Sequence, residues 1–237
     1  QCSIIDSHSV ITHEIKDSYI LLINNFDETV VDEIEELLVG IDETKDIIID
    51  LRCNRGGGLS HLLDVYSYLT NEDISFKTWN YSTAESGVAT YYKKEETVFK
   101  NKVYVLTSNA SFSGSNLFAS MVKDNNLATI IGEQTQGGAA AVRYVVLPDT
   151  SVLSMSSNKL FRNNEGELVE DGVTPHIDIE GKLDFVEFRK IIKEYNDDFL
   201  EGEIITSINQ GSIHFRMDFE SGFDESIIKK YEIVQYD

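Results

Sequence analysis

Hydrophobic and polar residues follow two different spacings along the first half of the chain. Residues 19–24 and 46–51 are short, mostly apolar runs typical of strands, and residues 30–39 place apolar side chains at helical spacing. A strand, a helix and a second buried strand in this order form a βαβ unit. The alternation continues with predicted helices over 59–69 and 113–125, and with predicted strands over 103–107 and 128–131. The pattern therefore predicts an α/β layered sheet.

The second half of the chain has a weaker pattern. Residues 140–147 and 152–156 are typical of a hairpin that turns at Pro148 and Asp149, and residues 185–195 have helical spacing. Short strands are predicted over 204–208, 213–219 and 231–236, either as an accessory sheet or as an extension of the main one. We therefore expect a core over residues 1–182 and, over residues 183–237, a C-terminal extension made of a helix and a small β unit.

Composition agrees with a folded chain and narrows its partners. The 237 residues are 41% hydrophobic and 26% charged, a balance typical of soluble globular proteins with one large domain or two small ones. The 20 basic and 41 acidic side chains give a net charge of -21, which repels phosphate backbones and anionic lipid headgroups. Nucleic acid is therefore not an expected partner, and no apolar run is long enough to span a membrane.

The sequence does not indicate metal or cofactor chemistry. Cys2 and Cys53 are too few for a disulfide framework, and no cysteine or histidine group has the spacing of zinc ligands. Residues 56–61 (GGGLSH) do not match the glycine pattern of a dinucleotide site, and no Walker lysine follows them. We expect neither a metal nor a cofactor.

Three predicted strands end in segments suited to acyl-transfer chemistry. A glycine turn at 56–58 follows the first, Ser113 opens the helix after the second, and glycines at 137–138 follow the third. Glycine turns let backbone N–H groups approach a developing oxyanion, and a helix N-terminus stabilises negative charge on a serine. A tight turn and a simple N-cap are the plainer explanations of the same residues. The G-x-S-x-G pattern of α/β hydrolases is absent around Ser113.

The order of these motifs resembles that of the S41 serine peptidases, which include the C-terminal processing (tail-specific) proteases and the tricorn core proteases. The matching segments are residues 18–26 (SYILLINNF), 50–57 (DLRCNRGG), 111–115 (SFSGS), 132–137 (GEQTQG) and 172–176 (GVTPH). The resemblance covers about residues 10 to 182 and implies a protease core with a crotonase/ClpP-like fold. The PDZ domain that usually precedes this core in the family has no counterpart in the printed sequence.

Carried over by position, the resemblance implies that Ser113 is the nucleophile and that the backbone N–H groups of Gly57 and Gly114 form the oxyanion hole. Neither base of the family stands at its usual place. Gly138 replaces the lysine of the processing proteases, and Leu21 replaces the histidine of the tricorn branch. A serine needs such a base to become a good nucleophile.

Several other side chains are candidates for this general base. They are His8, His13, His61, His176, His214 and Lys159. His176 is the provisional base, because its motif ends near the tricorn-type site in the family, and His61, just past the glycine turn, ranks second.

These features predict a serine endopeptidase that cleaves extended peptides or protein C-termini through an acyl-enzyme on Ser113. The main alternative is a catalytically inactive relative that binds a peptide or apolar ligand in the same groove, and a weaker one is a crotonase-like acyl-CoA enzyme. The resemblance implies an extracytoplasmic or secreted location, with a cytoplasmic location as the alternative, and the oligomeric state is open. For a peptidase, the charge of -21 favours basic or neutral peptides.

Overall fold

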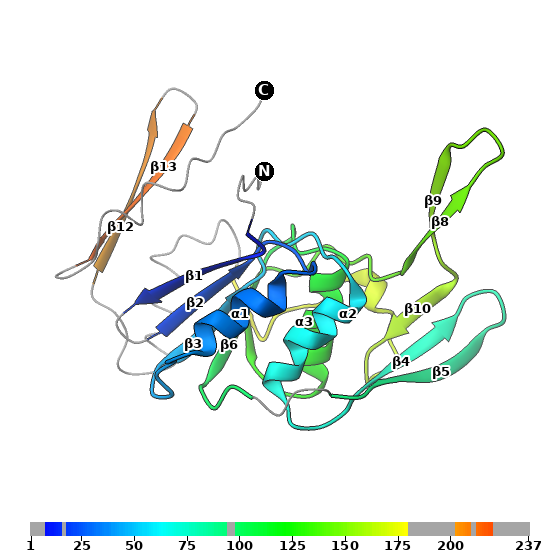
Figure 1. Ribbon diagram of the computed structural model, residues 1–237, viewed down its shortest axis with the longest axis horizontal. Coiled ribbons are helices and arrows are strands. Elements are labelled where there is room, and N and C mark those ends of the chain that lie inside the picture. The colour runs from blue at the N-terminus through cyan, green and yellow to red at the C-terminus, as the bar shows by residue number, and fades with distance from the viewer. Residues whose placement is uncertain (1–7, 16–17, 94–97, 180–201, 210–211, 220–237) are drawn as a thin grey trace.

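A six-stranded sheet forms the centre of the computed structural model, which describes residues 8–15, 18–93, 98–179, 202–209 and 212–219 (Figure 1). In spatial order its strands are β1 (Val10–Ile15), β2 (Ser18–Ile23), β3 (Asp46–Asp50), β6 (Val103–Thr107), β7 (Thr129–Gly132) and β11 (Ile177–Asp178). β1 is antiparallel to β2, and all other neighbours are parallel. The carboxyl ends of the parallel strands therefore meet along one edge of the sheet.

Three helices connect the parallel strands. α1 (Val30–Leu38) lies between β2 and β3 in the chain, α2 (Leu59–Tyr66) follows β3, and α3 (Gly114–Asp124) lies between β6 and β7. Figure 1 shows them side by side in front of the sheet. The helical spacing of apolar residues explains α1, because Val30 and Ile34 lie one turn apart and both are fully buried.

The core lies between these helices and the sheet. β3 has three consecutive isoleucines between Asp46 and Asp50, and β6 is apolar up to its last residue, because both strands are buried in the middle of the sheet. Phe118 of α3 stacks on Phe26 and meets Tyr66 of α2 edge-on, each with ring centroids 5.8 Å apart. This aromatic cluster fixes α3 against the loop that follows β2.

Smaller β units surround the core. β4 (Ile74–Asn80) pairs with both β5 (Glu85–Tyr91) and β10 (Lys159–Arg162) in an antiparallel sheet. β8 (Val142–Val146) and β9 (Val152–Ser156) form a hairpin that projects from the body, with exposed side chains along both strands (Figure 1). β12 (Gly202–Asn209) and β13 (Ser212–Phe219) form another hairpin. The 3-10 turns are η1 (Ser67–Leu69) and η2 (Val169–Asp171).

The α/β prediction is confirmed, and the predicted elements up to residue 131 nearly coincide with observed ones. The sequence pattern missed β1, β4, β5, β10 and β11. Several of these strands are short or carry polar, exposed side chains, so the apolar alternation of a half-buried strand is weak in them. The predicted helix over 185–195 and strand over 231–236 lie outside the described residues. Within those residues, no helix has the length and apolarity to span a bilayer.

Candidate active site

Three loops from the carboxyl edge of the sheet meet at the start of α3. Backbone hydrogen bonds connect them: the Phe112 N–H donates to the Asn54 carbonyl (3.1 Å), and the Ser113 N–H donates to the Gly137 carbonyl (3.0 Å). A β-bridge between Phe26 and Gly57 also connects the loop after β2 to the glycine turn. The structure thus brings together the three strand-end segments on which the acyl-transfer prediction depends.

A buried asparagine fixes the glycine turn. The Asn54 amide donates to the carbonyl of Ile23 (3.0 Å), and its oxygen accepts the Gly56 N–H (2.7 Å). Gly56 has φ +102, and a Cβ on it would lie 2.7 Å from the nitrogen of Gly114 and 2.8 Å from the Cβ of Ser113. Only glycine fits this position, because the turn and the start of α3 are in direct contact.

Two backbone N–H groups near Ser113 have no acceptor in the described part of the chain. A Cβ on Gly114 would lie 3.3 Å from the nitrogen of Gly57, so the two glycines face each other. The N–H groups of Gly56 and Gly58 have acceptors, whereas those of Gly57 and Gly114 have none within the described segments. Gly114 is the first residue of α3, where N–H groups have no partner within the helix. Such a pair can hold an oxyanion.

The serines of this segment differ in their hydrogen bonds. Ser111 donates to the Leu51 carbonyl (2.7 Å), and Ser115 donates to the Asn54 carbonyl (2.7 Å), so both hydroxyls are committed to structure. The half-buried Ser113 hydroxyl has no hydrogen-bond partner among the described residues. Ser113 also has φ +57 and ψ -114, a strained conformation of the kind found at functional sites.

The structure does not bring His176 to Ser113. The ring Nδ1 of His176 accepts the N–H of Ile130 (3.0 Å) near the amino end of β7, whereas the candidate site lies beyond the carboxyl end. Its pKa is lowered by burial and then by the charge of Lys123, which lies in the last turn of α3. Lys123 is ten residues after Ser113, which corresponds to about 15 Å along α3 at 1.5 Å per residue. His176 therefore has a structural role here and is not proposed as the base.

The other candidate bases are spread over the molecule. His13 is opposite Ile20 in the β1–β2 pair, where burial lowers its pKa. Lys159 begins β10, and His214 lies on β13. The ring of His61 lies against Gly58, where a Cβ would be 2.7 Å from the ring Cδ2. Of these four, only His61 adjoins the glycine turn.

His8 lies at the same edge of the sheet, beside the loop after β2. Its carbonyl accepts the Asn24 amide (2.9 Å), and its Nδ1 is 3.5 Å from Oε1 of Glu33 on α1. The other oxygen of Glu33 accepts the Val10 N–H (2.6 Å), which fixes the carboxylate beside the imidazole. The sequence did not single out Glu33, because it is far from His8 along the chain and no motif surrounds it.

The structure also explains the glycine at the position of the family's lysine. Gly138 has φ +70, and a Cβ there would overlap the Phe112 ring and lie 2.7 Å from its Cζ. The Phe112 ring fills the space that a side chain at 138 would enter. A lysine base at this position is therefore incompatible with Phe112.

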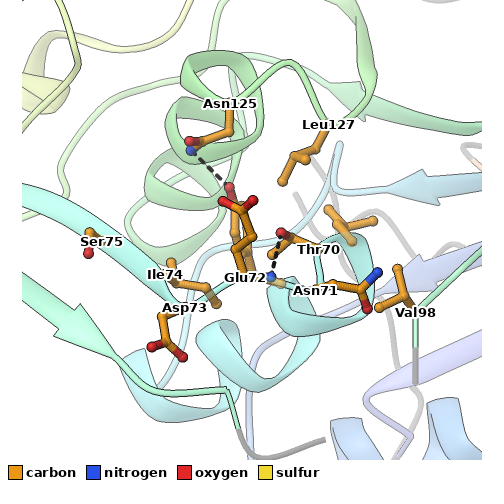
Figure 2. A pocket seen from close by; sticks show the side chains of 11 residues that line it. Thr70, Asn71, Glu72, Asp73, Ile74, Ser75, Val98, Asn125 and Leu127 are labelled. Atoms are coloured by element: carbon orange, nitrogen blue, oxygen red, sulfur yellow. Dashed lines mark hydrogen bonds between the residues drawn. The ribbon is translucent and has the colours of Figure 1, made fainter. Parts of the chain in front are cut away.

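A disulfide and a cavity lie elsewhere in the fold. Cys53 is disulfide-bonded at the start of the glycine turn, which the low cysteine count did not lead us to expect. A cavity of about 460 Å³ is lined by Thr70, Glu72, Asp73 and Asn125, among others, and Figure 2 shows these side chains. Because Asn125 caps the carboxyl end of α3, this cavity is at the opposite end of the helix from Ser113.

Comparisons with known proteins agree with the motif order. The model of peptidase family S41 matches residues 19–179. A carboxy-terminal-processing protease of Bartonella bacilliformis is 26% identical over 143 residues, which cover 60% of this chain and 32% of the relative. The chain thus spans about a third of that relative's length.

Two solved structures have a similar fold. A putative peptidase from Parabacteroides merdae has a TM-score of 0.64 at 18% identity, covering 79% of this chain and 62% of the other. The photosystem II D1 C-terminal processing protease has a TM-score of 0.56 at 20% identity, covering 70% of this chain and 43% of the other. Because the family model matches more than half of its length, this chain belongs to peptidase family S41, a family of proteases.

Proposed function

We propose that this protein is a serine endopeptidase with Ser113 as its nucleophile. The observation that carries the proposal is the position of Ser113 at the N-terminus of α3, beside Gly57 and Gly114, whose N–H groups have no acceptor among the described residues. A peptide carbonyl between these groups would have its carbon next to the serine oxygen. The arrangement supports acyl transfer rather than simple capping.

The reaction would proceed in two halves. The Ser113 oxygen attacks the scissile carbonyl while a base takes its proton, and the N–H groups of Gly57 and Gly114 stabilise the oxyanion. The dipole of α3 adds stabilisation of negative charge at this end of the helix. The base then protonates the leaving amine, and water hydrolyses the acyl-enzyme.

His8, beside Glu33, is the base that we propose. It is at the same edge of the sheet as Ser113, and a carboxylate beside the Nδ1 atom would leave Nε2 to take the serine proton. β1 lies three strands from β6, whose following loop carries Ser113, or roughly 14 Å at ordinary strand spacing, so contact with Ser113 requires a closer geometry with substrate bound. His61 is the alternative base. If His61→Gln abolishes turnover and His8→Gln does not, the assignment to His8 is wrong.

The proposed substrate class is based on the family to which the chain belongs. Extended peptides or protein C-termini are the proposed substrates, in line with the carboxy-terminal-processing relative. We further propose a crotonase/ClpP-like core over residues 1–182 with an extension over 183–237. An extracytoplasmic or secreted location is also part of the proposal, supported by the disulfide bond of Cys53, since such bonds persist in oxidising compartments.

Cleavage of a diverse peptide library, followed by mass spectrometry, tests the proposal. Wild type should cut a subset of peptides, and Ser113→Ala should cut none. Ser115→Ala is the matched control. Ser115 is two residues after Ser113, and its hydroxyl donates a hydrogen bond to the Asn54 carbonyl. Equal cleavage by wild type and Ser113→Ala would refute the proposal. Tight peptide binding by wild type without cleavage would indicate the inactive, peptide-binding alternative.

A further inference from the structure

An arginine stands inside the glycine turn of the candidate site. Arg55 is exposed, whereas its neighbours Asn54 and Gly56 are buried and hydrogen-bonded to each other. The backbone on both sides of Arg55 is therefore fixed. Gly57, whose N–H is one half of the proposed oxyanion hole, is only two residues away.

The aromatic ring before the nucleophile holds the guanidinium of Arg55. Arg55 Cζ lies 5.5 Å from the ring centroid of Phe112, within cation–π distance. Phe112 directly precedes Ser113, and its ring lies against Gly138. Stacking on a ring leaves the N–H donors at the edge of a guanidinium available. The cation is thus held beside the nucleophile with donors free to bind a ligand.

Arg55 has no acidic partner among the described residues. Arg52, three residues earlier, forms a bidentate pair with Asp50, with its shortest contact at 2.5 Å. In the part of the chain that the structure describes, no carboxylate lies within ion-pair distance of Arg55. A planar, unpaired guanidinium at the mouth of a site is well suited to a carboxylate, which it can bind with two parallel hydrogen bonds.

We propose that Arg55 is a specificity-determining residue that binds a carboxylate of the substrate. An arginine side chain two residues from Gly57 extends over roughly two residues of an extended peptide, at about 3.3 to 3.6 Å per residue. The bound group is therefore an α-carboxylate or an Asp or Glu side chain within about two residues of the scissile bond. This inference rests on the proposed peptidase function.

The net charge does not oppose this assignment. A charge of -21 repels acidic peptides at long range, but salt screens that field over about 10 Å at 0.1 M ionic strength. Arg55 acts at contact distance. The combination favours peptides that are neutral or basic overall and carry one carboxylate near the cleavage point.

Matched peptides provide the test. A fluorogenic peptide found in the library is made with a C-terminal carboxylate close to the scissile bond and again with a C-terminal amide. A second pair, amidated at the C-terminus, carries Asp or Asn at the same place. The enzymes are wild type, Arg55→Gln, Arg55→Lys and the control Lys100→Gln. Lys100 is 72% exposed and precedes β6, at the sheet edge opposite the site.

We expect wild type to favour the carboxylate member of at least one pair roughly fivefold to tenfold in kcat/KM, the size of one charge-assisted hydrogen bond discounted for solvent exposure. Arg55→Gln should reduce that ratio to near one, Arg55→Lys should retain part of it, and Lys100→Gln should leave it unchanged. The pair in which wild type shows this preference identifies whether Arg55 binds the C-terminal carboxylate or an acidic side chain. An unchanged ratio in Arg55→Gln, or no preference in wild type, overturns the inference. Failure of wild type to cleave any of these peptides overturns the proposed function instead.

Discussion

Placing a methyl group on Gly138 tests whether the Phe112 ring excludes a side chain from this position. In Gly138→Ala the new Cβ overlaps the ring and lies 2.7 Å from its Cζ, and the residue must also keep φ +70. The left-handed conformation costs an alanine about 1 to 2 kcal/mol, and overpacking adds about 1 to 3 kcal/mol. We expect the free energy of unfolding to fall by about 2 to 5 kcal/mol.

A double-mutant cycle separates the two contributions. Urea unfolding is measured for wild type, Gly138→Ala, Phe112→Ala and the double variant. Removing the ring relieves the steric part and leaves the backbone part, so Gly138→Ala should cost about 1 to 3 kcal/mol less in the Phe112→Ala background. A coupling energy near zero would refute the steric argument. A loss below about 0.5 kcal/mol in the single variant would also refute it, since most surface substitutions fall in that range.

Further predictions concern other groups of the fold. His176 Nδ1 accepts the Ile130 N–H, and burial and Lys123 lower its pKa, so its stabilising effect is present above about pH 6.5 and is lost as the pH falls through the lowered pKa. His176→Asn retains an acceptor without titrating, so its free energy of unfolding in urea should vary less between pH 5 and 8 than that of wild type. An unchanged profile would exclude this role for His176. Buried Asn116 donates to the Val169 carbonyl (2.7 Å) and accepts from the Thr135 hydroxyl (2.5 Å). Asn116→Ala should therefore lower the free energy of unfolding in urea by about 3 kcal/mol, and a decrease below about 1 kcal/mol would contradict this prediction. Dithiothreitol should lower wild-type stability by about 2 to 4 kcal/mol and leave Cys53→Ser unaffected, and equal sensitivity of the two proteins would argue against a stabilising disulfide at Cys53.

The sequence predicted the α/β core because its strands are buried on both faces. β3 contains three consecutive isoleucines and β6 is apolar up to its last residue, and such runs are visible without a structure. β5 was missed because its residues are exposed or half-buried, so its sequence has no regular alternation of apolar and polar residues. β11 has two residues, too few to carry any period.

Motif order brought Ser113, Gly57 and Gly114 to notice, and the structure places these three residues side by side. The sequence could not locate a base, since a histidine becomes a candidate only through what surrounds it in space. His176 follows a family motif, yet β11 runs parallel to β7 and places it at the amino end of that strand. The roles proposed for Glu33 and Phe112 depend on contacts between distant segments, which one sequence does not show.

Labelling with a fluorophosphonate tests most directly whether Ser113 is an activated nucleophile. The folded protein is treated with the probe at neutral pH, and intact mass and peptide mapping locate the adduct. We predict one adduct on wild type, on Ser113, and none on Ser113→Ala, with Ser115→Ala labelled like wild type. Absence of labelling on wild type, or an adduct that persists in Ser113→Ala, would contradict the assignment of Ser113 as the nucleophile.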